Sequence, residues 1–139
     1  MKVKILNDLN EDIIAIRTEA FVVGRNVPKE VELDGCDHLL LHFCLYDGDI
    51  LLSYLRAEQS GEGMHLGRVT TRAEVRRRGY GRMLMDYVAC YAKEKGCHFL
   101  ELHAVDTAVG FYEKLGFSTH GEYFMETGVP HIYMKKPLQ

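Results

Sequence analysis

Three arginines and two glycines stand together near the middle of the chain, in the run Arg76-Arg77-Arg78-Gly79-Tyr80-Gly81. β-branched residues before this run predict a strand over 66–72, and the apolar spacing after it predicts a helix over 82–95. A helix start leaves backbone N–H groups unpaired at the positive end of the helix dipole. Glycines remove the Cβ atoms that would keep a ligand from the backbone. The run therefore predicts an anion site, with phosphate or pyrophosphate as the expected ligand.

Two known phosphate-binding motifs do not fit this run. A P-loop requires GxxxxGK followed by Ser or Thr, and the sequence contains no such stretch. A dinucleotide-binding fingerprint requires a third Gly or Ala, and the residue at that place is Leu84. The plain alternative, that Gly79 and Gly81 only form a tight turn, remains open at this point.

Several residues further along the chain could take part in proton transfer. Glu101 and His103 alternate within a strand predicted over 97–104, and polar side chains in a largely buried strand must find partners or line a cavity. Glu126 is expected in the loop before the last strand, and His131 at the start of that strand. Because imidazole titrates near neutrality, His103 or His131 could deprotonate an ammonium group. A purely structural role for each histidine, or a water relay without a dedicated base, are the alternatives.

Four acidic residues lie in the irregular segment 24–37, namely Glu30, Glu32, Asp34 and Asp37. One interpretation is a solvated acidic loop, the usual form of such a group. The other is one wall of a substrate site that attracts a cation. Pro28, inside this segment, is expected to break the preceding helix.

The whole pattern predicts one domain over residues 1–139, of the α/β class (an α+β mixed sheet) with helices on both faces of a mostly antiparallel sheet. Asp8 and Glu11 resemble a capping box for a first helix that continues to Phe21. Asp47-Gly48-Asp49 predicts a hairpin, and Gly96 and Gly116 are expected just past two helices. The expected strands cover 3–6, 38–46, 50–56, 66–72, 97–104, 117–124 and 131–135, and the helices after the first cover 82–95 and 107–115.

Composition narrows the class of protein. The 139 residues carry a formal net charge of −3, which argues against a general nucleic-acid binder. Membrane-spanning runs and a secretory signal are not apparent, so we expect a cytoplasmic protein that does not bind membranes. The four cysteines lack metal-site spacing, so we expect no metal and free thiols, buried at Cys44 and Cys90.

Four stretches of the sequence resemble one known family. The stretch LGRVTTRAEVRRRGYGRML matches the strand, loop and helix of the GNAT superfamily of N-acetyltransferases, including its R/Q-x-x-G-x-G/A signature. The stretch AVGFYEKLGF, from Ala108 to Phe117, resembles the second hallmark of that family. AFVVGRNVPKEVELDGCD and GEYFMETGVPHIYMKK are similar to its ElaA-like branch, so that the resemblance covers nearly the whole chain.

The resemblance implies acetyl-CoA as the acyl donor and a primary amine of a small molecule as the acceptor. A cationic amine is expected if the acidic segment 24–37 lines the site. Thr71 would polarise the thioester through its N–H, and Tyr112 would protonate the departing thiolate; a core tyrosine is the alternative for Tyr112. The candidate acceptor-side residues are Glu30, Glu32, Asp34 and His103, with Glu126 and His131 as the base candidates. The implied cofactor-binding residues are Val69, Thr70, Thr71, Arg76, Arg77, Arg78, Gly79, Tyr80, Gly81, Ala108 and Phe111.

Two positions depart from the family pattern. Val105 stands where an asparagine is usual, and Gly24-Arg25 stands where the branch usually has Glu-Gln. These departures keep open a second class of function, a CoA-binding sensor or interaction module without catalysis. A third possibility is polyanion binding by the arginines, which the negative net charge disfavours. A homodimer is possible.

Overall fold

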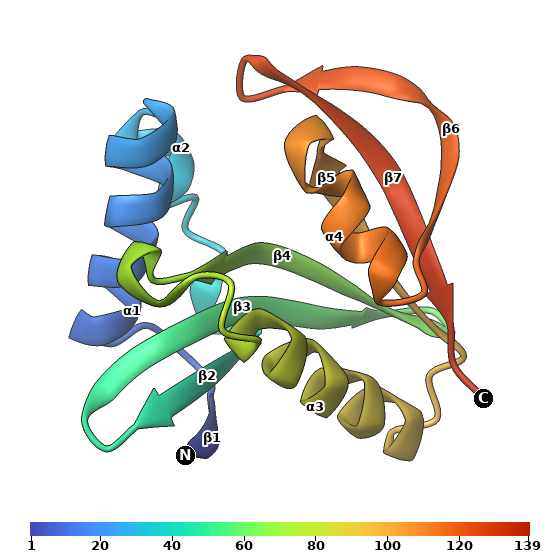
Figure 1. The fold of residues 1–139 in the computed structure, drawn as a ribbon, viewed down its shortest axis with the longest axis horizontal. Helices are drawn as coiled ribbons and strands as arrows, with labels where there is room; N and C mark the ends of the chain where they lie inside the picture. The colour runs from blue at the N-terminus through green and yellow to red at the C-terminus, as the bar shows by residue number, and fades with distance from the viewer. The chain divides into compact units, whose positions relative to one another are not determined.

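The computed structural model describes residues 1–139, and its strands form a seven-stranded sheet in the order β1-β2-β3-β4-β5-β7-β6 (Figure 1). β4 and β5 are parallel, whereas β1–β2, β2–β3, β5–β7 and β6–β7 are antiparallel. The predicted mixed, mostly antiparallel sheet is therefore confirmed. The strands are β1 (Lys2–Leu6), β2 (Leu41–Asp47), β3 (Ile50–Ser60), β4 (Gly63–Thr71), β5 (Phe99–Val105), β6 (Ser118–Glu126) and β7 (Val129–Pro137), and the helices are α1 (Glu11–Arg17), α2 (Lys29–Glu32), α3 (Tyr80–Glu94) and α4 (Val109–Lys114).

The chain divides into two compact units. Unit 1 comprises Met1–Glu58 and Arg68–Val88, and unit 2 comprises Gln59–Gly67 and Ala89–Gln139. β4 and α3 each contribute residues to both units. No helix of the protein is both long and apolar enough to cross a membrane.

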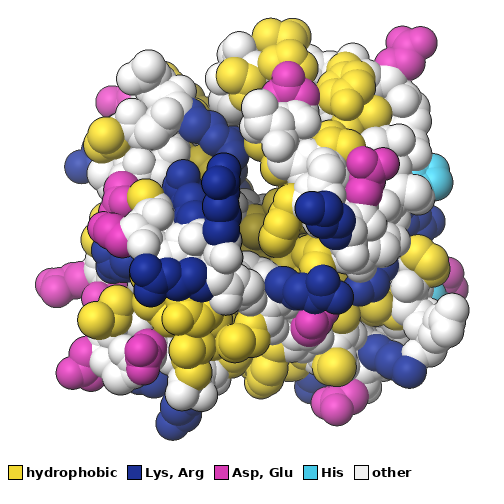
Figure 2. Space-filling model, in the orientation of Figure 1, with side chains coloured by type: hydrophobic (Ala, Val, Ile, Leu, Met, Phe, Trp, Pro, Cys, Tyr) yellow, Lys and Arg dark blue, Asp and Glu magenta, His cyan; other side chains and the backbone are white.

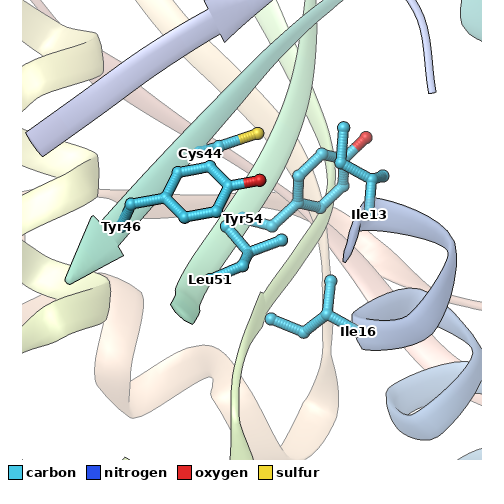
Figure 3. Close-up of a cluster of buried hydrophobic side chains, with 6 residues drawn as sticks. All are labelled: Ile13, Ile16, Cys44, Tyr46, Leu51 and Tyr54. Atoms are coloured by element: carbon cyan, nitrogen blue, oxygen red, sulfur yellow. The ribbon is translucent and has the colours of Figure 1, made fainter. Parts of the chain in front are cut away.

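The core of unit 1 forms where α1 packs on β2 and β3 (Figure 3). Ile13 and Ile16 of α1 contact a group of buried side chains on these two strands, made up of Cys44, Tyr46, Leu51 and Tyr54. The pairs Cys44–Tyr54 and Tyr46–Leu51 are directly opposite in the β2–β3 register, so their side chains share one face. This face and the apolar stripe of α1 account for the local packing.

α3 lies on the opposite face of β2. Phe43 alternates with Cys44 along the strand, so its side chain points the other way, and its ring lies 6.4 Å from that of Tyr87 on α3. Leu84 and Val88, on the same helix, are fully buried. Within unit 1, helices therefore cover both faces, as the sequence predicted.

Unit 2 is built on β5, β7 and β6, with α4 against β5 and β6. Along β5, Leu100, Leu102 and Ala104 are buried, whereas Glu101 is partly exposed and His103 is exposed. The expectation that the Glu101–His103 face would be largely buried is therefore wrong. A Cβ on Gly63 would come within 2.1 Å of the Phe99 ring, so the start of β4 requires glycine to lie beside β5.

Several local predictions are also wrong in detail. α1 is capped by Asn10, whose side-chain oxygen accepts from the Ile13 N–H at 2.8 Å, and not by Asp8. A π-helix, Thr18–Val23, follows α1. The β6–β7 connection consists only of Thr127-Gly128, so Glu126 ends β6 and His131 lies inside β7. Cys90 is exposed rather than buried, although all four cysteines are free thiols.

Candidate active site

The arginine–glycine loop, residues 72–79, connects β4 to α3 as predicted. A short 3₁₀ turn, Ala73–Val75, precedes Arg76. The Met83 N–H donates to the Gly79 carbonyl at 3.0 Å, so the N–H groups of Tyr80, Gly81 and Arg82 come before the hydrogen-bond ladder of α3. These donors lie at the positive end of a 15-residue helix. The loop can therefore bind an anion through its backbone.

Left-handed backbone angles set the path of this loop. Arg77 has φ +67° and Gly79 has φ +85°, and no atom lies within 4 Å of the place where a Cβ on Gly79 would stand. A side chain would fit at this position, so glycine is favoured here because of its positive φ and not because space is lacking. Lys and Arg side chains gather over this part of the surface in the space-filling view (Figure 2).

Two arginines at this junction donate hydrogen bonds to backbone carbonyls. The Arg76 Nε donates to the Thr71 carbonyl at 3.2 Å, and the Arg72 Nε donates to the Leu51 carbonyl at 2.8 Å. These bonds fix the end of β4 to its surroundings. Arg76, Arg77 and Arg78 are all exposed, but Arg76 already donates to Thr71, so Arg77 and Arg78 are the arginines best placed to reach a ligand that sits on the loop.

The end of β4 is fastened on the β3 side. Ser53 Oγ donates to the Thr70 carbonyl at 3.0 Å and lies 2.9 Å from Thr71 Oγ1. The β4–β5 register runs only from Gly63–Phe99 to Leu66–Leu102. The segment Val69–Thr71 thus lies beyond the pairs that β4 forms with β5, with Arg68 in a left-handed conformation of φ +54° just before it.

The acidic segment of unit 1 is not a solvated loop, because two of its carboxylates are buried. Glu32 is 2% exposed and Asp37 is 4% exposed. The fully buried Arg17 contacts both, through Nε to Glu32 Oε1 at 2.8 Å and through Nη1 to Asp37 Oδ1 at 2.6 Å. Buried carboxylates need such partners because isolated charges are costly away from water.

Two further arginines complete this ion-pair network. Arg56 bridges Asp34 Oδ2 at 2.7 Å and Asp37 Oδ1 at 3.1 Å, and Arg68 Nε contacts Glu32 Oε2 at 2.5 Å. Three arginines thus face three carboxylates, so Glu32 and Asp34 carry no surplus negative charge toward a ligand. Of the proposed cation-attracting residues in this segment, Glu30 alone is exposed on α2 without an ion pair in the structure.

The network shifts the pKa values of its members in the expected directions. Hydrogen bonding from Arg56 holds the pKa of Asp34 well below its usual range. Burial acts to raise the pKa of Asp37, but hydrogen bonds and charge from Arg17 and Arg56 outweigh it, so this pKa is also lowered. Burial likewise opposes the charge of Arg17, but Glu32 and Asp37 raise its pKa overall.

Unit 2 brings together three residues that the sequence analysis named separately. His103 Nδ1 lies 3.0 Å from Glu126 Oε1, and His131 Nε2 lies 3.6 Å from Glu126 Oε2. A carboxylate can only accept, so the bond to Glu126 places the proton of neutral His103 on Nδ1 and leaves Nε2 as a proton acceptor. His131 is 4% exposed and its Nδ1 donates to the Val129 carbonyl at 3.0 Å.

A second carboxylate, Glu101, stands beside this group on β5. His65 Nδ1 lies 2.7 Å from Glu101 Oε2, and the Tyr133 hydroxyl donates to Glu101 Oε1 at 3.2 Å. The rings of His65 and His103 are 5.3 Å apart. Burial, together with the Glu101 carboxylate, raises the pKa of Tyr133, which keeps its hydroxyl a donor.

Tyr112 lies on α4 in unit 2, 7% exposed, with its ring 5.2 Å from Phe111 and 5.6 Å from Phe117. Its backbone carbonyl accepts from the N–H groups of Leu115 and Phe117. Phe111 is 40% exposed, and Ala108 ends the 3₁₀ turn that leads into α4. Tyr112 is therefore packed in an aromatic cluster, and its acid role stays a prediction.

Sequence reasoning missed Arg17, Arg56, His65 and Tyr133. One signal for Arg17 existed, because it falls on the same helical face as Ile13, where a charged residue is unusual unless paired. His65 and Tyr133 gave no such signal. Their partner Glu101 comes from another strand, and only the sheet register brings the three together.

Known proteins resemble this chain over nearly its whole length. The family model described as acetyltransferase (GNAT) domain matches residues 11–138. The uncharacterised N-acetyltransferase YjcF of Bacillus subtilis is 31% identical over 127 residues, 91% of each protein.

Two solved structures are also similar over almost the whole chain. An acyl-CoA N-acyltransferase from Pseudomonas aeruginosa has a TM-score of 0.83 at 26% identity, covering 98% of this chain and 99% of that one. ElaA of Escherichia coli has a TM-score of 0.84 at 26% identity, with the same coverage. The chain belongs to the GNAT acetyltransferase family, and it is an N-acetyltransferase. The resemblance stated from the sequence is confirmed.

Proposed function

We propose that this N-acetyltransferase transfers an acetyl group from acetyl-CoA to the primary amine of a small, cationic acceptor. The observation that carries the proposal is the start of α3, where unpaired backbone N–H groups follow Gly79 and exposed arginines. Backbone donors at a helix start, with positive charge beside them, suit a pyrophosphate. Family membership supports acetyl-CoA as its source.

The donor would lie along the end of β4 and on the loop. Val69, Thr70 and Thr71 pair with the pantetheine arm, and the N–H groups from Arg76 to Gly81 hold the pyrophosphate, with Tyr80 opening the helix. The bond from Arg76 to the Thr71 carbonyl suggests that this side chain fixes the strand, whereas Arg77 and Arg78 contact the phosphates. Ala108 and Phe111 are the further donor-binding residues that family membership suggests.

The preference for a cation comes from unit 2 rather than from the segment 24–37. Glu101 and Glu126 lie beside histidines, whereas Glu32, Asp34 and Asp37 are paired with arginines. With neutral histidines, the two glutamates keep their negative charge. An ammonium group is attracted to such partly buried carboxylates because screening by water is reduced.

Acetyl transfer then needs a base, an oxyanion partner and an acid. His103, oriented by Glu126, would accept the proton of the ammonium group at Nε2. His131, the other histidine candidate, is held by the bond from its Nδ1 to the Val129 carbonyl. The free amine attacks the thioester carbonyl, whose oxygen the Thr71 N–H polarises. As the C–S bond breaks, Tyr112 would give its proton to the CoA thiolate, and the acetylated nitrogen would lose its surplus proton to solvent, from which Tyr112 is protonated again.

A thiol-release assay with acetyl-CoA tests the proposal on a panel of polyamines, aminosugars, amino acids and peptides. The expected result is turnover on at least one amine, highest for acceptors with a second positive charge. Binding of acetyl-CoA without turnover on any amine would favour a sensor or interaction module. The sequence feature that suggests this alternative is Val105, which stands where the family usually has asparagine. Displacement of acetyl-CoA by RNA at moderate salt would instead indicate polyanion binding.

The remaining expectations stand as part of the proposal. They are a reaction without a metal, a cytoplasmic protein that does not bind nucleic acid or membranes, a single domain and a possible homodimer. Activity that survives a chelator, measured in the same assay, addresses the first of these.

A further inference from the structure

Arg68 has a backbone conformation that its residue type disfavours. It lies inside β4, three residues before Thr71, with φ +54°. A residue with a Cβ rarely adopts this angle and does so only where the surrounding structure requires it. Something in unit 1 must therefore hold the strand in this path.

The side chain of Arg68 is held at several points. Its Nε contacts Glu32 Oε2 at 2.5 Å, and its Nη2 donates to the carbonyls of Glu32 at 3.1 Å and Val31 at 3.4 Å. Asp34 Oδ2 lies 3.7 Å from the same Nη2. These bonds tie β4 to Val31 and Glu32, the last two residues of α2.

Glu32 is itself immobilised. Its Oε1 accepts from Arg17 Nε at 2.8 Å, its Oε2 from Arg17 Nη2 at 3.2 Å, and its carbonyl from the same Nη2 at 2.9 Å. Arg17 has no exposed surface and also contacts Asp37. A buried charge with this many partners cannot shift without leaving another charge unpaired, so Glu32 is a rigid anchor for Arg68.

The bend lies where β4 stops pairing with β5. The last pair is Leu66–Leu102, and Arg68 follows two residues later. Beyond the bend, Ser53 and Leu52 hold Thr70 and Arg72 on the β3 side. The backbone of Val69–Thr71 is thus fixed on one edge and turned at its start by Arg68.

We propose that Glu32 and Arg68 are positioning residues, which bend β4 so that the backbone of Val69–Thr71 is presented to the acyl donor. This inference rests on the proposed use of acetyl-CoA at that segment. The buried network thereby gains a part in the reaction. Arg68 is its link to the donor-binding segment, because it directly precedes Val69. It also turns the acidic segment from a cation site into a structural support of the donor strand.

Substituting Arg68 by alanine and by glycine separates the effect of its backbone conformation from the effect of its guanidinium group. Both variants lose the ion pair, but only glycine adopts positive φ readily. We expect Arg68→Ala to lower kcat/KM for acetyl-CoA about tenfold to a hundredfold, since small misplacements of reacting groups have effects of this size. Arg68→Gly should keep several times the activity of Arg68→Ala, and KM for the amine should change little in either.

Asn26→Ala serves as the matched control, because Asn26 also has a positive φ of 55° but lies outside β4. This variant should lose stability without changing kcat/KM for acetyl-CoA. Glu32 is unsuitable for substitution because Arg17 would be left buried without its partner.

Hydrogen exchange of the amides at residues 69–71, without ligand, gives a second readout that does not depend on turnover. Exchange should be faster in Arg68→Ala than in Arg68→Gly. Equal exchange in the two variants, or equal loss of activity, overturns the inference. If the wild type shows no turnover but the two variants differ in exchange, the bend is supported and the proposed function fails instead.

Discussion

At the scale of single residues, the structure separates two kinds of carboxylate. Glu32 and Asp37 are buried against arginines, and Glu101 and Glu126 are partly exposed beside histidines. Their partners decide what each can do, because an arginine neutralises a carboxylate permanently whereas a neutral histidine does not. From residue type alone, the two groups of carboxylates could not be told apart, so the partners of Glu32 and Asp34 were not foreseen.

Replacing Glu126 by glutamine removes the charge that orients His103 while keeping the shape of the side chain. We expect kcat to fall about tenfold or more, since a positioned base contributes about a hundredfold or more to such reactions. Glu122→Gln, on the same strand and exposed, is the control and should leave kcat unchanged. Steady-state rates with saturating acetyl-CoA measure both, and equal rates for the two variants would remove Glu126 from the mechanism.

Tyr112→Phe removes the proposed acid without removing the ring that packs between Phe111 and Phe117. We expect kcat to fall by about a hundredfold, with little change in the affinity for acetyl-CoA. Tyr123→Phe, on exposed β6, is the control. Unchanged turnover in Tyr112→Phe would show that Tyr112 is only a core residue.

At the scale of elements, the sequence predicted turns and helix ends correctly, but it did not predict contacts between distant elements. The Asp47-Gly48 hairpin and the glycines past two helices were predicted correctly, because turn chemistry is written in neighbouring residues. The first helix cap was misassigned because Asn10 and Asp8 are both good caps two residues apart. The burial of Glu32 and Asp37 could not be foreseen, because Arg17, Arg56 and Arg68 come from distant elements.

The two ends of α3 offer a matched pair of glycines. Gly79 precedes the helix with φ +85°, and Gly96 follows it with φ +86°, and neither has an atom within 4 Å of a Cβ position. Alanine at either place should cost about 1 kcal/mol of stability through backbone strain. Only Gly79→Ala should weaken the binding of CoA, seen as a smaller CoA-induced rise in Tm. Equal rises in both variants would contradict the assignment of the loop.

At the scale of the whole molecule, the ion-pair network links α1, α2, β3 and β4 of unit 1. It also makes the free energy of unfolding depend on pH in the acid range. The pKa of Asp34 and that of Asp37 are lowered in the folded state. Their contribution is therefore complete above the unfolded value of about 3.9 and is lost as the pH falls from there toward the folded values. The fold and the loop were predictable from sequence, but this network was not, because it exists only once distant arginines meet.

Asp34→Asn tests this linkage at a side chain that is partly exposed, so the protein should still fold. We expect the variant to lose about 1 kcal/mol at pH 7 and to show a smaller loss of stability between pH 5 and pH 3. Chemical denaturation at each pH provides the free energies of unfolding. Asp49→Asn, in the exposed hairpin turn, is the control, and an identical pH dependence in both variants would contradict the network account.

The central claim is that the arginine–glycine loop binds acetyl-CoA through its pyrophosphate. Calorimetric titration of acetyl-CoA into the wild-type protein tests it most directly. The account predicts binding of one acetyl-CoA per chain, with an affinity that falls as salt is raised, because exposed arginines contribute to it. No detectable heat of binding at millimolar acetyl-CoA would contradict it.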